Sequence, residues 1–262
     1  MKTTTKIAVA AGLLITTVGL VGFGTWRYRI SRGAAAAAQA VIVRDRSDSQ
    51  LGGCDGVAGM TRELIDSFPF GTGSQVGLMI TGDAATAGEP VLVVALDVPV
   101  SKRVTEGKGM VVERQQALVE KFKQGCRNAG QTSQSPVYLS IRRAVEYLRA
   151  HGCDGRNRCV VYVQSDLEEL SEKGIRDYVD RSARTDARYR VSLPTQIDNS
   201  GIEVKICGLS ETAGAAEVAG KRKTLTPQHD ARRVDVLTDV WRQLFSDPSR
   251  VAFNSHCPKA NE

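Results

Sequence analysis

Apolar residues along the chain follow two alternating patterns, short β-branched runs and longer stretches with helical spacing. The short runs predict strands at residues 41–43, 75–81, 90–98, 159–165, 202–207 and 251–253. The helical spacing predicts helices over 57–68, 110–125, 137–149, a stretch that starts at 167, and 234–245. Strands that alternate with helices in this way predict an α/β fold with a doubly wound, mostly parallel sheet and helices on both faces.

Turn-forming residues mark several helix ends. Pro69 and Gly71 predict the end of the first helix, and Ser135 followed by Pro136 predicts an N-cap and a first-turn proline for the third. The third helix should face the core through an apolar stripe made of Val137, Ile141, Ala144, Val145 and Leu148. This stripe is the most regular helical pattern in the chain.

Two other stretches lead to more specific expectations. In the second helix we expect Ala117, Leu118 and Phe122 to face the core and the helix to end near Gly125. Residues 209–232 interrupt the alternation with Gly and Ala, followed by Lys221, Arg222 and Lys223. We interpret this segment as a loop insertion whose charges are solvated.

The chain has 262 residues, of which 42% are apolar and 5% aromatic, enough for one α/β domain of about 200 residues. The net charge is +6, but the first 33 residues hold five of the 35 basic residues and no acidic residue. The remainder therefore has a net charge of only +1, and the composition does not indicate nucleic-acid binding.

Residues 7–26 contain no charged residue and are long enough to cross a bilayer as a helix, with Trp26 and Tyr28 at one interface. A cleavable signal peptide is the alternative, because alanines at 34–38 offer small-residue cleavage sites. The apolar segment is longer than a usual signal core. We therefore expect residues 1–33 to be a transmembrane anchor with its flanks, and residues 38–257 to be the folded domain.

Charge and cysteine content give opposite indications about membrane orientation. Basic residues flank residues 7–26 on both sides and slightly favour a cytoplasmic domain. Six cysteines favour an oxidising compartment, and Cys153 and Cys159 form the most readily bridged pair; buried reduced thiols are the alternative. We expect a single-pass protein of the inner (plasma) membrane whose disulfide-bonded domain is periplasmic or extracellular.

Candidate chemistry lies where the first strand ends. Asp45, Ser47 and Ser49 follow a buried strand at alternate positions. Ligands in open α/β sheets gather beyond the carboxyl ends of strands, and carboxylate and hydroxyl oxygens suit a hard cation such as Mg²⁺. A polar turn that satisfies local backbone donors would use the same residues.

The chain resembles a von Willebrand factor type A domain, a doubly wound fold with a metal-ion-dependent adhesion site. Asp45, Ser47 and Ser49 match the Asp-x-Ser-x-Ser motif of that family. The family also places a Thr before a helix, where Ser135 or Thr132 stands here, and an Asp after the fourth strand, where Asp166 stands. The resemblance covers roughly residues 40–255. Leu167 occupies a position at which the family often has Gly.

The resemblance implies a protein-binding module for adhesion or assembly, and no enzymatic activity. The five residues implied as ligands of Mg²⁺ (or Mn²⁺ or Ca²⁺) are Asp45, Ser47, Ser49, Ser135 and Asp166, and a carboxylate of a protein partner would complete the coordination. One alternative is a structural envelope protein without metal. A metal-assisted hydrolase is the other, although Ser47 stands where such enzymes have a second Asp.

Overall fold

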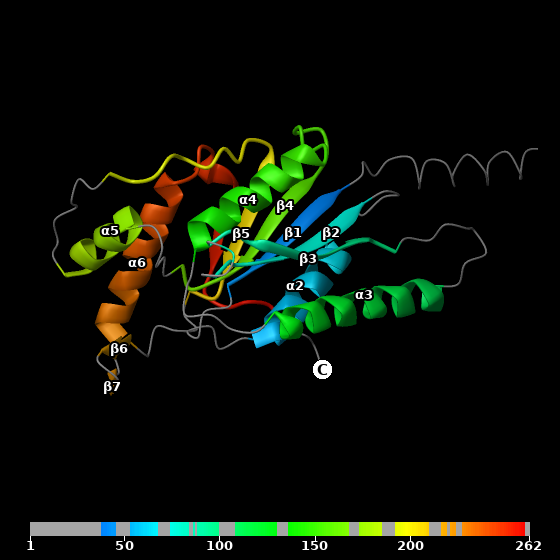
Figure 1. Cartoon of the computed structure of the whole chain (residues 1–262), viewed down its shortest axis with the longest axis horizontal. Helices are drawn as coiled ribbons and strands as arrows, with labels where there is room; N and C mark the ends of the chain where they lie inside the picture. Colours follow the sequence, from blue (N-terminus) through cyan, green and yellow to red (C-terminus); the bar gives the residue numbers. More distant parts are fainter. Residues whose placement is uncertain are drawn as a thin grey trace, which may run out of the picture.

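A computed structural model of the chain describes residues 38–45, 53–67, 74–83, 86, 88–99, 108–129, 136–167, 173–184, 192–209, 216–218, 221–223 and 227–259. Its centre is a six-stranded sheet in the order β3-β2-β1-β4-β5-β8 (Figure 1). These strands are β1 (Gln39–Arg44), β2 (Gln75–Ile80), β3 (Val91–Asp97), β4 (Cys159–Gln164), β5 (Ile202–Cys207) and β8 (Val251–Asn254). Within this sheet only the β2–β3 pair is antiparallel, so the predicted mostly parallel α/β sheet is confirmed.

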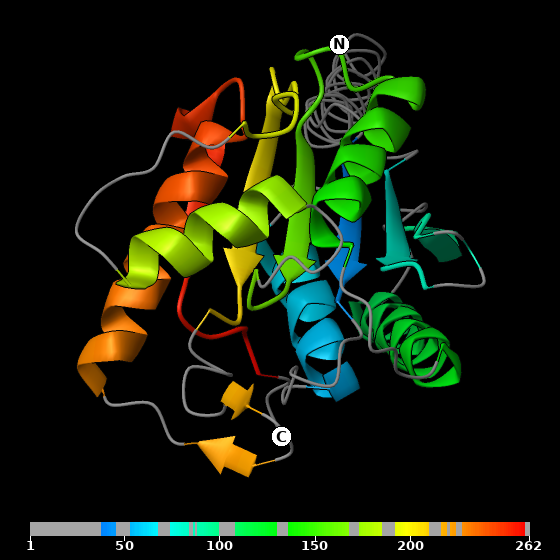
Figure 2. The same cartoon turned by 60° about the vertical axis from the view of Figure 1, so that its left-hand side comes forward.

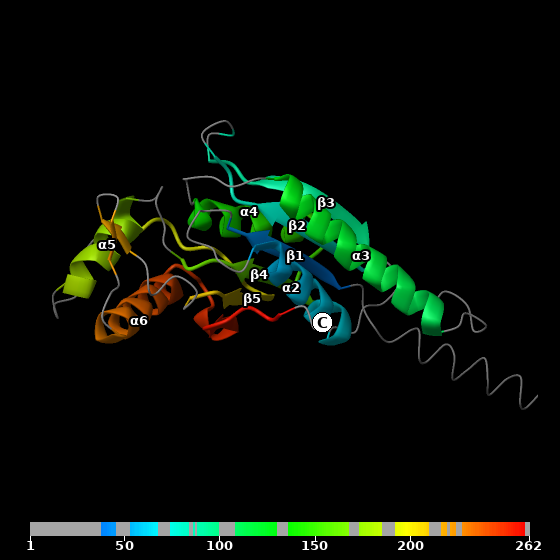
Figure 3. The ribbon, with the colours of Figure 1, turned by 90° about the horizontal axis from the view of Figure 1, so that it is seen from below.

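Helices cover both faces of the sheet (Figure 3). The helices α2 (Gly53–Ser67) and α3 (Lys108–Asn128) pack on one face, and α4 (Val137–Ala150), α5 (Lys173–Arg184) and α6 (Pro227–Gln243) pack on the other. In β1, Ile42 joins the α2 and α3 core, whereas Val41 and Val43 join the opposite core. Both faces of β1 are therefore buried, which explains why its sequence is a continuous apolar run.

The helix α3 differs from its prediction in length and in the residues that it buries. Leu118 and Phe122 lie in the core as expected, but Ala117 is exposed and Val119 is buried in its place. Gly125 does not end the helix, which continues to Asn128. A Cβ atom at Gly125 would lie only 3.1 Å from Cγ1 of Val93, so this glycine allows close packing of α3 on the sheet.

Two further segments differ from the predicted elements. The helix expected to start at residue 167 begins at Lys173, and Leu167 itself has a non-helical backbone with φ of 62°. The segment 209–232, predicted as a loop, contains β6 (Ala216–Val218), β7 (Lys221–Lys223) and the first residues of α6. Strands β6 and β7 form a separate two-stranded sheet, apart from the main sheet in Figure 2.

The predicted anchor at residues 7–26 lies outside the described residues. Among the helices that the structure describes, none combines the length and apolar character needed to cross a bilayer.

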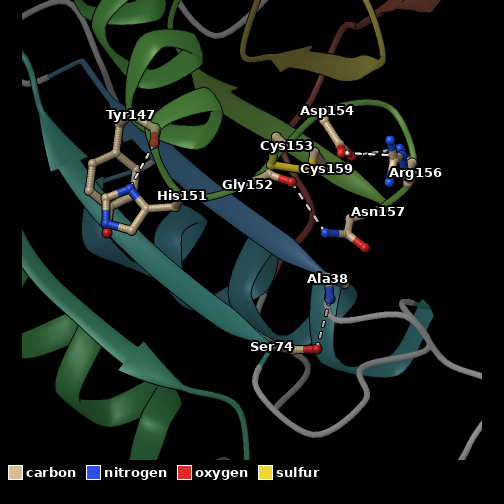
Figure 4. The surroundings of a disulfide bond; sticks show 10 residues. All are labelled: Ala38, Ser74, Tyr147, His151, Gly152, Cys153, Asp154, Arg156, Asn157 and Cys159. Carbon is tan, nitrogen blue, oxygen red and sulfur yellow. Dashed lines mark hydrogen bonds and ion pairs between the residues drawn. A yellow bond between two sulfur atoms is a disulfide. The ribbon is translucent and has the colours of Figure 1, made fainter.

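Three disulfides connect the six cysteines in pairs. The predicted Cys153–Cys159 bond is confirmed, and it closes the turn between α4 and β4, where the Asn157 side chain also donates to the Gly152 carbonyl (Figure 4). The bond between Cys54 and Cys126 joins the first turn of α2 to the last turn of α3. The bond between Cys207 and Cys257 fastens the end of β5 to the C-terminal segment.

We expect the Cys54–Cys126 bond to stabilise the domain more than the Cys153–Cys159 bond does. The first joins residues 72 positions apart and the second joins residues 6 positions apart, so the first restricts the unfolded chain more strongly. Loop-closure entropy predicts a loss of about 4 kcal/mol for the paired Cys54→Ala and Cys126→Ala variant, against about 2 kcal/mol for the pair at 153 and 159. Urea unfolding of both variants measures the difference, and equal losses would contradict this explanation.

Candidate functional site

The candidate site lies where β1 and β4 end, at the point where the strand order of the sheet reverses direction. Ligand sites of doubly wound sheets are usually built at this position. The parallel register pairs Arg44 with Gln164, and the Asp45 N–H continues it by donating to the Gln164 carbonyl at 2.9 Å. This backbone bond brings Asp45 to the end of β4, directly beside Ser165.

One hydroxyl group connects the two loops. Ser165 Oγ donates to Asp45 Oδ2 at 3.0 Å and accepts a hydrogen bond from the Leu167 N–H at 2.9 Å. Asp45 and Ser165 are fully buried and Asp166 is 1% exposed. Two buried carboxylates, those of Asp45 and Asp166, therefore follow the ends of neighbouring strands at the carboxyl edge of the sheet.

Leu167 gives the loop after β4 an unusual backbone conformation. Its φ of 62° lies in the left-handed region, which costs a residue with a Cβ atom about 1–2 kcal/mol. Its side chain is nevertheless buried in the core, and its carbonyl accepts a hydrogen bond from the Trp241 indole at 3.1 Å. Core packing and this hydrogen bond hold Leu167 in the left-handed conformation, which a glycine would adopt without strain.

The start of α4 lies at the same edge of the sheet. Pro136 occupies the N-cap position and not the first turn as predicted, and it accepts hydrogen bonds from both the backbone N–H and the hydroxyl of Ser140. A Cβ atom at Gly88 would lie 3.9 Å from Cβ of Pro136, which places the β2–β3 connection against α4. Arg143 of α4 holds Glu89 at 2.7 Å, and this guanidinium lowers the pKa of the Glu89 carboxyl.

Of the residues predicted as metal ligands, the structure describes Asp45 and Asp166, and both are buried after neighbouring strands. Ser47, Ser49 and Ser135, with the alternative Thr132, lie outside the described residues. Within the described ranges, no group of three or more His, Cys, Asp or Glu side chains is placed to hold a metal ion. The described donors are carboxylate and hydroxyl oxygens, and this set fits a hard cation such as Mg²⁺ better than zinc or copper.

Sequence reasoning missed Ser165 as a functional residue. Its role depends on the register between β1 and β4, because its hydrogen-bond partner Asp45 lies 120 positions away. The available signal was its place: a hydroxyl residue at the end of a buried strand, directly before Asp166.

Removal of the Ser165 hydroxyl should destabilise the domain. A Ser165→Ala variant leaves the buried Leu167 N–H and one oxygen of Asp45 without this partner, which should cost about 1–3 kcal/mol. The exposed Ser192 provides a control, because Ser192→Ala should change the stability by no more than about 0.5 kcal/mol. Urea unfolding of both variants compares the two losses, and a Ser165→Ala variant as stable as the control would contradict the structural role.

The positive φ of Leu167 predicts that a Gly variant at this position is more stable than an Ala variant, which is the reverse of the usual order inside a helix. Both Leu167→Gly and Leu167→Ala lose the buried side chain, but only Gly removes the cost of a positive φ. We expect Leu167→Gly to be about 1 kcal/mol more stable than Leu167→Ala. At Ala144, in the middle of α4, the order should be the usual one, so Ala144→Gly should be less stable than the wild-type protein with Ala at this position. Thermal unfolding tests both orders.

No protein-family model and no curated protein matches the sequence. Among solved structures, the chain is similar to an aerotolerance-related membrane protein from Bacteroides fragilis, with 12% identity and a TM-score of 0.37 over 84% of this chain and 91% of that one. It is similar to the manganese-loaded TRAP protein of Plasmodium vivax, with 9% identity and a TM-score of 0.39 over 84% and 68% of the two chains. It is also similar to the vWF domain of the type V pili tip protein Mfa5 from Porphyromonas gingivalis, with 10% identity and a TM-score of 0.37 over 85% and 90%.

These similarities concern the fold alone. The chain is similar to von Willebrand factor type A domains in its doubly wound sheet.

Proposed function

We propose that the domain is a metal-ion-dependent protein-binding module for adhesion or assembly. Asp45, Ser47, Ser49, Ser135 and Asp166 would hold Mg²⁺, or Mn²⁺ or Ca²⁺ in its place. The cation would supply an electrophilic position that a carboxylate of a protein partner fills. The observation that carries the proposal is the pair of buried carboxylates, Asp45 and Asp166, at the carboxyl ends of neighbouring parallel strands.

The hydrogen bond from Ser165 supports a particular role for Asp45. It occupies Asp45 Oδ2 and fixes the carboxylate in one orientation. A fixed carboxylate that already accepts a hydrogen bond is suited to hold a metal-bound water. The serines would then be the direct ligands. A site with few direct charged ligands leaves the cation able to attract a partner carboxylate.

The available side chains favour binding over catalysis. All six cysteines are in disulfides, so the domain offers no thiol nucleophile. The Ser165 hydroxyl donates to Asp45 and accepts from Leu167, which suits a positioning role better than that of a nucleophile. We therefore propose that the protein is not an enzyme.

We further propose that residues 7–26 tether the domain to the inner (plasma) membrane as a single span, with the domain in the periplasm or outside the cell. Three disulfides support an oxidising compartment, because such bonds are rare in the cytosol. The uncharged segment at residues 7–26 supports the tether.

Calorimetric titration of the detergent-solubilised chain with Mg²⁺ and Mn²⁺ tests the metal site. We expect saturable binding that both Asp45→Asn and Asp166→Asn abolish, because each variant removes one of the two carboxylates. Asp66 is exposed at the far end of α2, so Asp66→Asn should bind like the wild type. Bound metal should also stabilise the fold by about 2.7 kcal/mol at a hundredfold excess over the dissociation constant.

Two results would contradict the metal site. Absence of binding at millimolar metal would favour a structural domain without a cation. Equal loss of binding in the Asp66→Asn control would show that the ion associates with surface charge and not with the carboxyl edge.

A further inference from the structure

The first two turns of α3 extend beyond the sheet. The Gln115 side chain donates to the Pro99 carbonyl at 3.3 Å, and Pro99 follows the end of β3. This end of β3 lies at the amino edge of the sheet, where the Val98 N–H donates to the Ser74 carbonyl and the Ala38 N–H donates to Ser74 Oγ. Helical residues before Gln115 therefore project past the amino edge, as Figure 3 shows.

The length of this projection follows from helix geometry. Seven residues separate Lys108, the first residue of α3, from Gln115, and at 1.5 Å per residue they span about 10 Å. We call residues 108–114 the α3 tip. The tip lies at the opposite edge of the sheet from Asp45 and Asp166, because β1 and β4 begin at the amino edge and end at the site.

The α3 tip exposes apolar side chains that the domain core does not use. Met110 is 54% exposed and Val112 is 48% exposed. The described residues contain only two other exposed large apolar side chains, Val91 and Leu92, and both are less exposed. Further along the same helix, Leu118 and Phe122 are buried. Two exposed apolar side chains in helical turns that project from the domain make the tip a candidate for contact with another apolar phase.

The path of the chain indicates what that phase is. Residue 38 lies at the amino edge beside Ser74, and residues 27–37 separate it from the predicted membrane segment. Eleven residues span at most about 40 Å, so a tethered domain keeps its amino edge near the bilayer. Glu113 and Arg114, both exposed in the tip, carry opposite charges, so contact of the tip with lipid would depend on its apolar side chains.

We infer that the α3 tip rests on the lipid surface, with Met110 and Val112 inserted at the headgroup boundary. This inference rests on the proposed tether and is independent of metal binding. Contact at two points, the tether and the tip, would restrict how the domain tilts on the membrane. The carboxyl edge, with the proposed binding site, would then point away from the bilayer.

Fluorescence quenching by brominated lipid tests the inference on the full chain. The chain is added, without divalent metal, to vesicles made of phosphatidylglycerol and of phosphatidylcholine whose acyl chains are brominated. Trp26→Phe removes the tryptophan of the predicted anchor, and Trp241 is buried in the core. In this background, Met110→Trp reports on the tip. Gln124→Trp is the control, because Gln124 is exposed on the same helix about 21 Å further along.

We expect the added fluorescence of Met110→Trp to be lost in brominated vesicles and that of Gln124→Trp to be retained. Val112→Trp should be quenched as well, and Met110→Glu added to it should abolish that quenching. Flotation of the vesicles reports the tether separately. Chain that floats without quenching at either position would overturn the contact of the tip and leave the tether standing.

Other outcomes would also overturn the inference. Equal quenching at both positions would indicate non-specific adsorption. Blue-shifted emission of Met110→Trp without quenching would show that protein covers the tip, either a second copy or another segment of this chain. Chain that does not float would exclude the tether and the lipid contact together, whereas the metal titration would remain a separate test of the binding site.

Discussion

The parallel pairing of β1 with β4 is the constraint on which the rest of the structure depends. Six residues of β1 pair with β2 on one side and with β4 on the other. Backbone bonds continue past the strand ends, from Asp45 to Gln164, from Ser165 to Cys207 and from Thr81 to Arg44. The neighbouring strands therefore end at one level, and the polar residues that follow them are held together in a buried place.

Burial at this edge explains why its residues are so closely interlinked. A carboxylate that is taken out of water is costly unless hydrogen bonds or cations compensate for the lost hydration. Asp45 has the Ser165 hydroxyl, and Ser165 is in turn positioned by the Leu167 backbone. This arrangement requires Leu167 to adopt an unfavourable left-handed conformation. The hydrogen bond from Trp241 and packing in the core stabilise that conformation.

The sequence predicted the elements better than their ends. Continuous apolar runs identified β1, β2 and β4, because strands buried on both faces have no polar alternation. The strand β5 was identified although its apolar residues alternate with Glu203 and Lys205. The pattern could not show that Gly125 serves close packing on Val93, nor that Leu167 takes a conformation in which glycine is the usual residue. The positions of Asp45 and Asp166 after buried strands could be predicted from the sequence. The hydrogen bond between Ser165 and Asp45 could not, because it depends on the register between two strands.

The helix α3 runs between the two edges of the sheet. Its last turn is fastened to α2 by the Cys54–Cys126 bond near the carboxyl edge, whereas its first turns project from the amino edge. A partner held at the carboxyl edge and a tether attached before Ala38 would pull on opposite ends of β1. Such a load acts along the strand and must shear two six-residue ladders together. The central parallel strand β1 is therefore well placed to connect the proposed binding site to the proposed tether.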